Sequence, residues 1–235
     1  MSNSASESKT HFSEDLIQGC LDVLTSGEIE DLFEIIPRIG VLRDPRFTEP
    51  LLALLKHRDT RRREFAAYAM AAVGNGEFVD PLKQCFEEIK ELRGAAAEEL
   101  QVAVLEAIGA IGDDGAAEFF LAVLESTDPE RRAKARMRRG VVEAMGAVAQ
   151  QGGERALDAL LGLTRNGDPE LRAQSVAELS VAYWHRPNEI PESTLQRIYQ
   201  LREDPDDGVS QSSVAALDSL ADVGCRRAER LFRSE

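Results

Sequence analysis

Residues 168–177 read DPELRAQSVA, and this stretch decides the fold. Asp168 can cap the N-terminus of a helix, and the proline that follows it suits the first helical position because its φ angle is already helical. Arg172 lies four residues after the aspartate. The same spacing of Asp and Arg marks two other helix starts, at Asp59/Arg63 and Asp128/Arg132.

Two apolar patterns repeat along the chain with a common period. The first is a triad of apolar residues at i, i+3 and i+4, which indicates one buried helix face; it begins at positions 51, 82, 120, 157, 195 and 228. The second consists of two apolar residues three apart and then a junction residue, and it precedes each triad. The junctions fall at positions 40, 74, 112, 149, 185 and 224, so successive units are 34 to 39 residues long. Glycine occupies four of the six junctions, as expected where a helix ends in a left-handed residue.

Each unit is therefore predicted to be a helix, a turn and a second helix. One such pair cannot bury its apolar face alone, so neighbouring pairs must stack to form a continuous core. We expect an all-α fold, an α-α superhelix of about six helix pairs that forms a single solenoid over residues 13–235. A helix at residues 13–26 is expected to cap its N-terminal end. The Ser-rich, polar residues 1–12 are expected to form a disordered tail.

The composition agrees with this fold and narrows the class of function. Aromatic residues make up 6% of the chain and good helix formers dominate, which argues against a β-sandwich or barrel. The net charge of -14 argues against nucleic-acid binding, which requires cations that neutralise phosphates. No segment of the sequence is long and apolar enough to span a membrane, and the three cysteines are too few and too far apart for a disulfide framework. These features predict a cytoplasmic protein.

The repeated landmarks resemble a known family. The stretch at 168–177, the AIGAIG that ends at Gly112 and the LDALL that ends at Leu161 resemble bacterial HEAT-like repeats, of the type also found in phycobilisome lyases. The resemblance covers roughly residues 28–233. It implies a right-handed superhelix, with the first helix of each pair on the convex side and the second on the concave side. It does not specify a function, since HEAT repeats occur in scaffolds, in transport factors and in a few enzymes.

No pattern in the sequence predicts catalysis. HEAT-like deoxyhypusine hydroxylases hold two irons with His-Glu pairs, and this sequence has three histidines and no His-Glu dipeptide. A glycine-rich phosphate loop and a nucleophile elbow are also missing from it. We therefore predict no catalytic residue, no metal and no cofactor.

Carboxylates gather on the predicted second helices. The candidates for partner binding are Glu87, Glu88, Glu118 and Asp158. HEAT-like alkylpurine DNA glycosylases need a basic groove, whereas these helices predict an acidic groove that would repel DNA. We expect the concave face to bind a protein partner, one with a basic or extended segment.

A run of cations lies on the predicted first helix of the fourth unit. Arg132, Arg136 and Arg139 share one helix face, and a second group lies nearby that consists of Arg131, Lys134 and Arg138. One interpretation is a docking patch for an acidic or phosphorylated partner. The other is that these cations pair with glutamates of the preceding first helix, or only keep the convex face solvated.

The fifth unit departs from the repeat at Tyr183, Trp184, His185 and Arg186. Alignment of the units places Trp184, the only tryptophan, at a core position, where it would fill a gap between units. The alternative is an aromatic rim in which Tyr183, His185 and Arg186 form a hot-spot cluster for a partner.

The sequence thus predicts a monomeric, non-catalytic protein-binding scaffold. Two other classes of function stay open. One is an enzyme subunit resembling a bilin lyase, which would handle a tetrapyrrole between protein partners. The other is a purely structural part of an oligomer.

Overall fold

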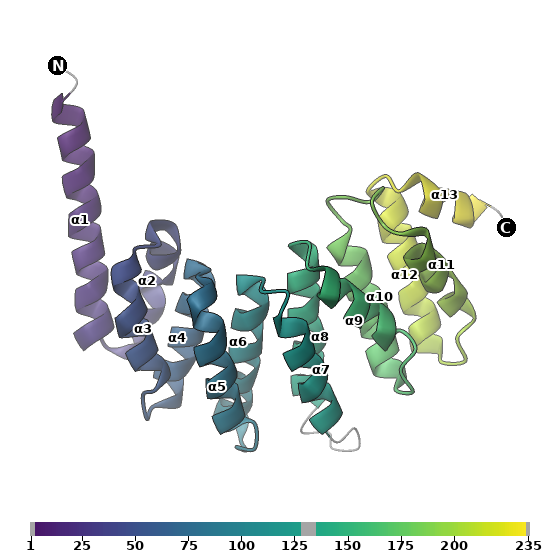
Figure 1. The fold of residues 1–235 in the computed structure, drawn as a ribbon, viewed down its shortest axis with the longest axis horizontal. Helices are drawn as coiled ribbons and strands as arrows, with labels where there is room; N and C mark the ends of the chain where they lie inside the picture. The colour runs from purple at the N-terminus through teal and green to yellow at the C-terminus, as the bar shows by residue number, and fades with distance from the viewer. Residues whose placement is uncertain (1–2, 128–134, 234–235) are drawn as a thin grey trace. The chain divides into compact units, whose positions relative to one another are not determined.

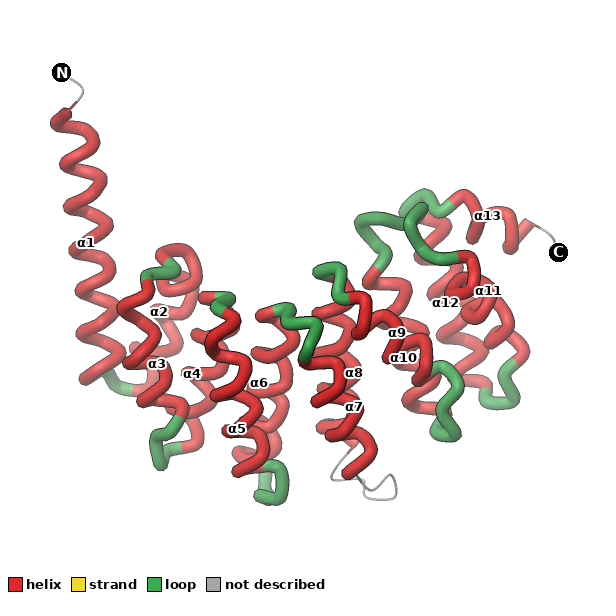
Figure 2. Tube along the Cα trace, in the orientation of Figure 1, coloured by secondary structure: helices red, strands yellow, loops and turns green. Residues whose placement is uncertain are grey.

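A computed structural model describes the backbone of residues 3–127 and 135–233, and the side chains of residues 14–127 and 135–231. Within these ranges all regular structure is helical and no strand occurs, as the sequence predicts (Figure 1, Figure 2). Contacts between Cα atoms divide the chain into two compact units, Met1–Ile111 and Gly112–Glu235. The sequence alone predicted one undivided solenoid, and the boundary falls at the junction of the third helix pair.

The first unit contains six α-helices. They are α1 (Asn3–Ser26), α2 (Ile29–Leu42), α3 (Thr48–Leu55), α4 (Thr60–Val73), α5 (Val79–Ile89) and α6 (Ala95–Ile111). Short 3-10 turns at Pro45–Phe47 and Gly76–Phe78 lead into α3 and α5. The first helices of successive pairs, α2, α4 and α6, lie side by side, and α3 and α5 each pack against the first helix that follows.

The second unit has the same kind of arrangement within itself. Its helices are α7 (Ala116–Ser126), α8 (Ala135–Gln150), α9 (Glu154–Leu163), α10 (Pro169–Ala182), α11 (Glu192–Gln200), α12 (Asp207–Asp222) and α13 (Arg226–Arg233). The first helices α8, α10 and α12 stack on one another, and the second helices α7, α9 and α11 each pack against the next first helix. The predicted all-α solenoid of helix pairs is confirmed within the described residues.

The apolar triads form the core, as predicted. Every residue of the triads that begin at Leu51, Leu82 and Phe120 is buried, and each fully buried Leu or Phe contributes about 2 kcal/mol. The fourth triad differs, because Leu157 and Leu161 are only half-buried. These two leucines face a pocket rather than the core.

The predicted turn chemistry holds at several helix ends. The carboxylate of Asp59 accepts a hydrogen bond from the backbone N–H of Arg61 at 2.9 Å, and Asp168 accepts one from Glu170 at the same distance. Gly74 and Gly112 have φ angles of 69° and 80°, the left-handed conformation in which glycine carries no Cβ penalty. The helix start predicted at Asp128 lies outside the described residues.

The stop predicted at Gly40 is wrong. Helix α2 continues through Gly40 to Leu42, and Arg43 takes the left-handed conformation in its place, with φ of 46°. Gly40 instead lies against α4, where an added Cβ would come within 3.0 Å of the Ala72 Cβ. Its missing side chain permits close helix packing.

The N-terminal helix is longer than expected. A disordered tail was predicted for residues 1–12, with a capping helix over 13–26, whereas α1 begins at Asn3. The stretch NSASESKTHF at residues 3–12 contains neither glycine nor proline, so it includes no strong helix breaker.

The core position predicted for Trp184 is also wrong. Helix α10 ends at Ala182, and Tyr183 follows with a non-helical ψ of 4°. Trp184 is 45% exposed, whereas Tyr183 is only 5% exposed. Because the helix ends before Trp184, that side chain no longer lies on the buried face, and Tyr183 takes the inward position.

Candidate functional site

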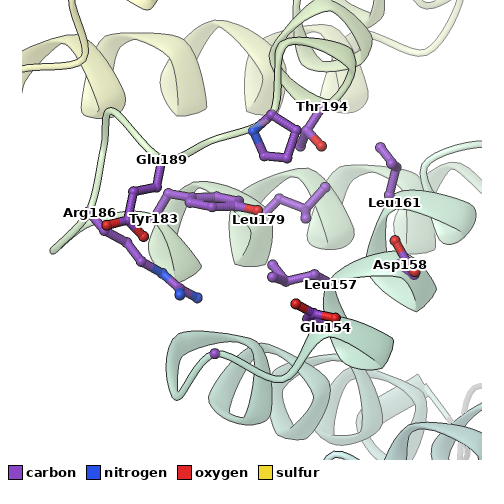
Figure 3. A pocket seen from close by; sticks show the side chains of 11 residues that line it. Glu154, Leu157, Asp158, Leu161, Leu179, Tyr183, Arg186, Glu189 and Thr194 are labelled. Atoms are coloured by element: carbon purple, nitrogen blue, oxygen red, sulfur yellow. The ribbon is translucent and has the colours of Figure 1, made fainter.

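The second helices of the second unit line two adjoining hollows that share Asp158. The α9–α11 pocket has a volume of about 350 Å³ and lies between α9, the end of α10 and the loop into α11 (Figure 3). The α7–α9 groove, of about 540 Å³, is lined by Ala117, Glu118 and Leu121 from α7 and by Arg155, Asp158 and Ala159 from α9. Asp158 on α9 is the residue that lines both hollows.

Helix α9 is held at its N-terminus by a residue from another repeat. Its own N-cap residue, Gly153, has no side chain to accept a hydrogen bond. The carboxylate of Asp114, which precedes α7, accepts from the backbone N–H groups of Arg155 and Ala156 at 3.3 and 3.2 Å. This contact satisfies helix-terminal donors that would otherwise lack a partner, and it fixes α9 relative to α7.

The loop between α10 and α11 is fixed by two arginines. Arg186 donates from Nη2 to the carbonyl oxygen of Ala149 at 2.9 Å, and its guanidinium lies over the Tyr183 ring at 5.5 Å. Arg227 on α13 donates to the carbonyl oxygens of Asn188 and Ile190. The loop therefore holds Glu189 and the start of α11 against the pocket.

One part of the α9–α11 pocket is apolar. Leu157 and Leu161 face it from α9, and Leu179 faces it from α10 (Figure 3). Leu157 and Leu161 are the half-buried leucines of the fourth triad, and Leu179 is almost fully buried. A hydrocarbon chain that enters the pocket would meet this wall.

Two hydroxyl groups in the pocket have no hydrogen-bond partner among the described residues. They belong to Tyr183 and Thr194, which are 5% and 4% exposed and both line the pocket. Burial raises the pKa of the Tyr183 hydroxyl, Arg186 partly offsets this, and the carboxylates of Asp158 and Glu189 raise it further. The hydroxyl therefore stays protonated, and it can both donate and accept a hydrogen bond.

The carboxylates of the pocket carry unneutralised charge. Glu154, Asp158 and Glu189 line it, and none of them has an ion-pair partner among the described side chains. Other predicted acidic residues are already paired within the chain. Glu118 pairs with Arg155 at 3.1 Å, Glu88 with Arg63 at 3.2 Å and Glu87 with Lys90 at 2.5 Å.

The predicted site residues thus fall into separate groups. Asp158, Tyr183 and Arg186 come together in the pocket, and Glu118 lies in the adjoining groove. Glu87 and Glu88 belong to the first unit. His185 is exposed and is not part of the pocket lining.

The cations of α8 are partly engaged within the fold. Arg138 pairs with the Asp168 cap at 2.6 Å, and Arg139 pairs with Glu170 at 3.5 Å. Both partners belong to the following first helix, whereas the sequence suggested glutamates of the preceding one. Arg136 is exposed. Arg131 and Arg132 lie outside the described residues.

The described part of the chain offers neither a cluster of metal ligands nor a membrane-spanning helix. No group of three or more His, Cys, Asp or Glu side chains there is placed to hold a metal ion. No helix in the same ranges is long and apolar enough to cross a membrane. The three cysteines, Cys20, Cys85 and Cys225, are buried and unpaired with one another.

Known proteins resemble this chain over part of its sequence and in its helical architecture. Residues 89–180 match the family described as HEAT repeats. No curated protein matches the sequence at a significant level. Among solved structures, the chain is similar to a crystal structure of an engineered protein at 19% identity and a TM-score of 0.46, covering 89% of this chain and 98% of that one. A second engineered protein gives 16% identity and a TM-score of 0.41, with 91% of this chain and 62% of the other covered.

The HEAT-repeat match includes α6 to α9 and most of α10, so it contains one wall of the pocket. The opposite wall, with Glu189 and Thr194, lies beyond the matched residues. Reasoning from the sequence did not select either residue. The one signal in the sequence is the distance from the junction at His185 to the triad at Leu195, which is longer than in the three preceding units. The triad pattern does not indicate that Leu157 and Leu161 are half-exposed.

Proposed function

We propose that this chain is a non-catalytic protein-binding scaffold of HEAT-like repeats, and that it binds an extended, basic segment of a partner protein. The segment would lie across α7, α9 and α11. The observation that supports this most is the pair of hollows that share Asp158. Together they provide room for successive side chains of one extended chain.

The charge of the surface selects the chemistry of the partner. Four carboxylates line the two hollows, Glu118, Glu154, Asp158 and Glu189, against the guanidinium groups of Arg155 and Arg186. The surface is net negative, as is the whole chain at -14. Such a field speeds association with a basic partner and disfavours acidic ones. The exposed Glu118–Arg155 pair is worth at most about 1 kcal/mol, so a partner can replace it at little cost.

The test is capture of a partner with a carbodiimide, which joins carboxylates to amines that contact them. The full-length protein would be incubated with a lysate of the organism that encodes it, then crosslinked, and the joined peptides would be identified by mass spectrometry. We expect crosslinks from Asp158 or Glu118 to lysines in a basic segment of one partner. Crosslinks that map only to other surfaces would overturn the proposal.

A matched pair of variants controls for charge alone. Asp158→Lys/Glu189→Lys reverses two charges in the pocket, and we expect it to lose the partner. Asp218→Lys/Asp222→Lys reverses two exposed charges on α12 and should keep the partner. Equal loss in both variants would indicate a non-specific electrostatic effect.

The tetrapyrrole-handling alternative is supported only by the resemblance of the repeats. An absorbance spectrum after incubation with biliverdin or haem tests it. A bound-pigment band that survives gel filtration would favour that alternative over a plain scaffold.

A further inference from the structure

We propose that the α9–α11 pocket receives a single arginine side chain of the partner, and this inference rests on the proposed function. Arginine combines an apolar stem with a planar group of five N–H donors. The pocket has the matching parts, an apolar wall and a set of acceptors without partners (Figure 3).

The apolar wall suits the stem of the side chain. Leu157, Leu161 and Leu179 face the pocket from two helices. The three methylene groups of an arginine would remove part of this surface from water, at about 0.8 kcal/mol for each methylene that becomes fully buried. A short polar side chain would leave the wall exposed.

Two hydroxyls that line the pocket suit the guanidinium group. Tyr183 and Thr194 are each more than nine-tenths buried as residues, yet their oxygens are not among the fully enclosed polar atoms of the described chain, so a ligand in the pocket can reach them. An oxygen in this position can accept an N–H from a ligand. Two such acceptors in one small pocket point to a ligand that brings several donors.

The resident arginine does not convert the pocket into an anion site. Arg186 already donates to the Ala149 carbonyl and lies over the Tyr183 ring. Three carboxylates without ion-pair partners in the described residues line the same pocket, and they belong to Glu154, Asp158 and Glu189. An incoming anion would meet this excess of negative charge, whereas a cation would reduce it.

The arrangement of acceptors favours arginine over lysine. Glu154 and Asp158 belong to α9, whereas Glu189 and Thr194 belong to the loop and to α11 on the other wall (Figure 3). A planar guanidinium can donate toward two walls at once, whereas an ammonium is a compact point charge.

The experiment uses small probes and the full-length protein. N-acetyl-arginine methylamide, its lysine analogue and its neutral citrulline analogue would each be titrated into labelled protein and followed by NMR. The indole N–H of Trp184, the only tryptophan, follows Tyr183 directly and gives one resolved reporter signal. We expect saturable shifts with arginine, at least about threefold weaker binding of lysine, and no saturable shift with citrulline.

Variants identify the groups that bind the probe. Asp158→Asn, Tyr183→Phe and Thr194→Val should each weaken arginine binding about three- to tenfold, while Asp218→Asn should leave it unchanged. Spectra of each variant would show whether it is folded. Equal affinity for arginine and citrulline, or unchanged affinity in both Tyr183→Phe and Thr194→Val, would overturn the inference.

The two proposals can fail separately. If crosslinking still places a basic segment on α7 and α9 but the arginine probe does not bind, the pocket assignment is wrong and the scaffold function stands. If the probe binds but Asp158→Lys/Glu189→Lys captures the same partner as the unmodified protein, the pocket exists and the proposed binding face is wrong.

Discussion

Glu178 on α10 occupies a notch that Gly146 leaves on α8. A Cβ added at Gly146 would overlap the Glu178 carboxylate and approach its Cβ at 3.1 Å. Burial raises the pKa of Glu178 to about 7, and the nearby carboxylate of Glu143 adds to the rise. Below about pH 7 a carboxyl group is therefore kept largely protonated at the contact between two stacked first helices.

This contact predicts a dependence of stability on pH. Between pH 4.5, the ordinary pKa of the group, and about 7, the folded state keeps a proton that the unfolded state releases. The free energy of unfolding must therefore fall as the pH rises through this window. Between pH 4.5 and about 7 we expect the free energy of unfolding of the unmodified protein to fall by about 2 kcal/mol more than that of Glu178→Gln. The expected difference is no larger because solvent partly screens the carboxyl group. Urea unfolding across the pH range measures this loss.

Glu143→Gln provides the control for the charge contribution. This substitution removes the carboxylate that adds to the rise of the Glu178 pKa. The pKa of Glu178 should therefore fall, and the loss of stability should be complete at a lower pH. If the unmodified protein and Glu178→Gln lose stability in parallel, the Glu178 carboxyl titrates normally and the prediction is wrong.

The notch itself predicts the effect of a larger residue. Gly146→Ala should destabilise the fold by about 1–3 kcal/mol, because the new methyl group forces Glu178 or the two helices apart. In an unstrained helix interior the same change would stabilise by up to about 1 kcal/mol. Glu178→Ala should recover part of the loss, and the coupling free energy in a double-mutant cycle measures that recovery. Additive effects would contradict this account.

The ion pair between Arg172 and Asp204 predicts a large cost of removal. The guanidinium donates to both carboxylate oxygens, at 2.7 and 3.0 Å, and both side chains are nearly buried. Asp204→Asn should cost about 2 kcal/mol, because it removes the negative charge beside a nearly buried guanidinium whose other acceptors are the neutral carbonyl oxygens of Asn166 and Gly167. The exposed Arg139–Glu170 pair is the matched control, and Glu170→Gln should change stability by less than about 1 kcal/mol. Similar losses from both substitutions would contradict the distinction.

The exposure of Trp184 predicts its spectroscopy and its small role in stability. A side chain that is 45% exposed should be quenched readily by acrylamide and emit at long wavelength. Trp184→Ala should cost less than about 1.5 kcal/mol, whereas truncation of a core tryptophan costs about 3–5 kcal/mol. Chemical denaturation of the two proteins gives the difference in free energy of unfolding. A difference of about 3–5 kcal/mol would instead indicate that Trp184 is buried in the core.

The fold could be predicted because it depends on repeated local features. Apolar spacing and aspartate caps act within a few residues, and each repeat presents them again. Glycines show where this reasoning ends. Gly112 and Gly40 look alike in sequence, yet the first ends a helix at φ of 80° and the second lies inside α2 against Ala72. Only the distance to the neighbouring helix distinguishes the two roles.

The site could be predicted only in part, because it depends on the distance between repeats. From the sequence, Asp158 is a candidate because it is a carboxylate on a predicted second helix. Tyr183 is a candidate because the fifth unit departs from the repeat at that residue. The sequence could not show that they meet in one pocket, since the loop after α10 sets how far α11 lies from α9. Thr194 and Glu189 had no distinguishing pattern for the same reason.

The aspartates of the second unit have a consequence for how that unit unfolds. Asp168 caps α10 and also forms an ion pair with Arg138 of α8, the preceding first helix. Asp204 accepts the Asp206 N–H in the turn into α12 and also receives Arg172 from α10. When the start of one first helix frays, the ion pair with the arginine of the preceding first helix is therefore lost as well. Each first helix is in this way less stable when its neighbour unfolds. Stability of this kind belongs to the interfaces between repeats, so α8, α10 and α12 should melt in a single cooperative transition.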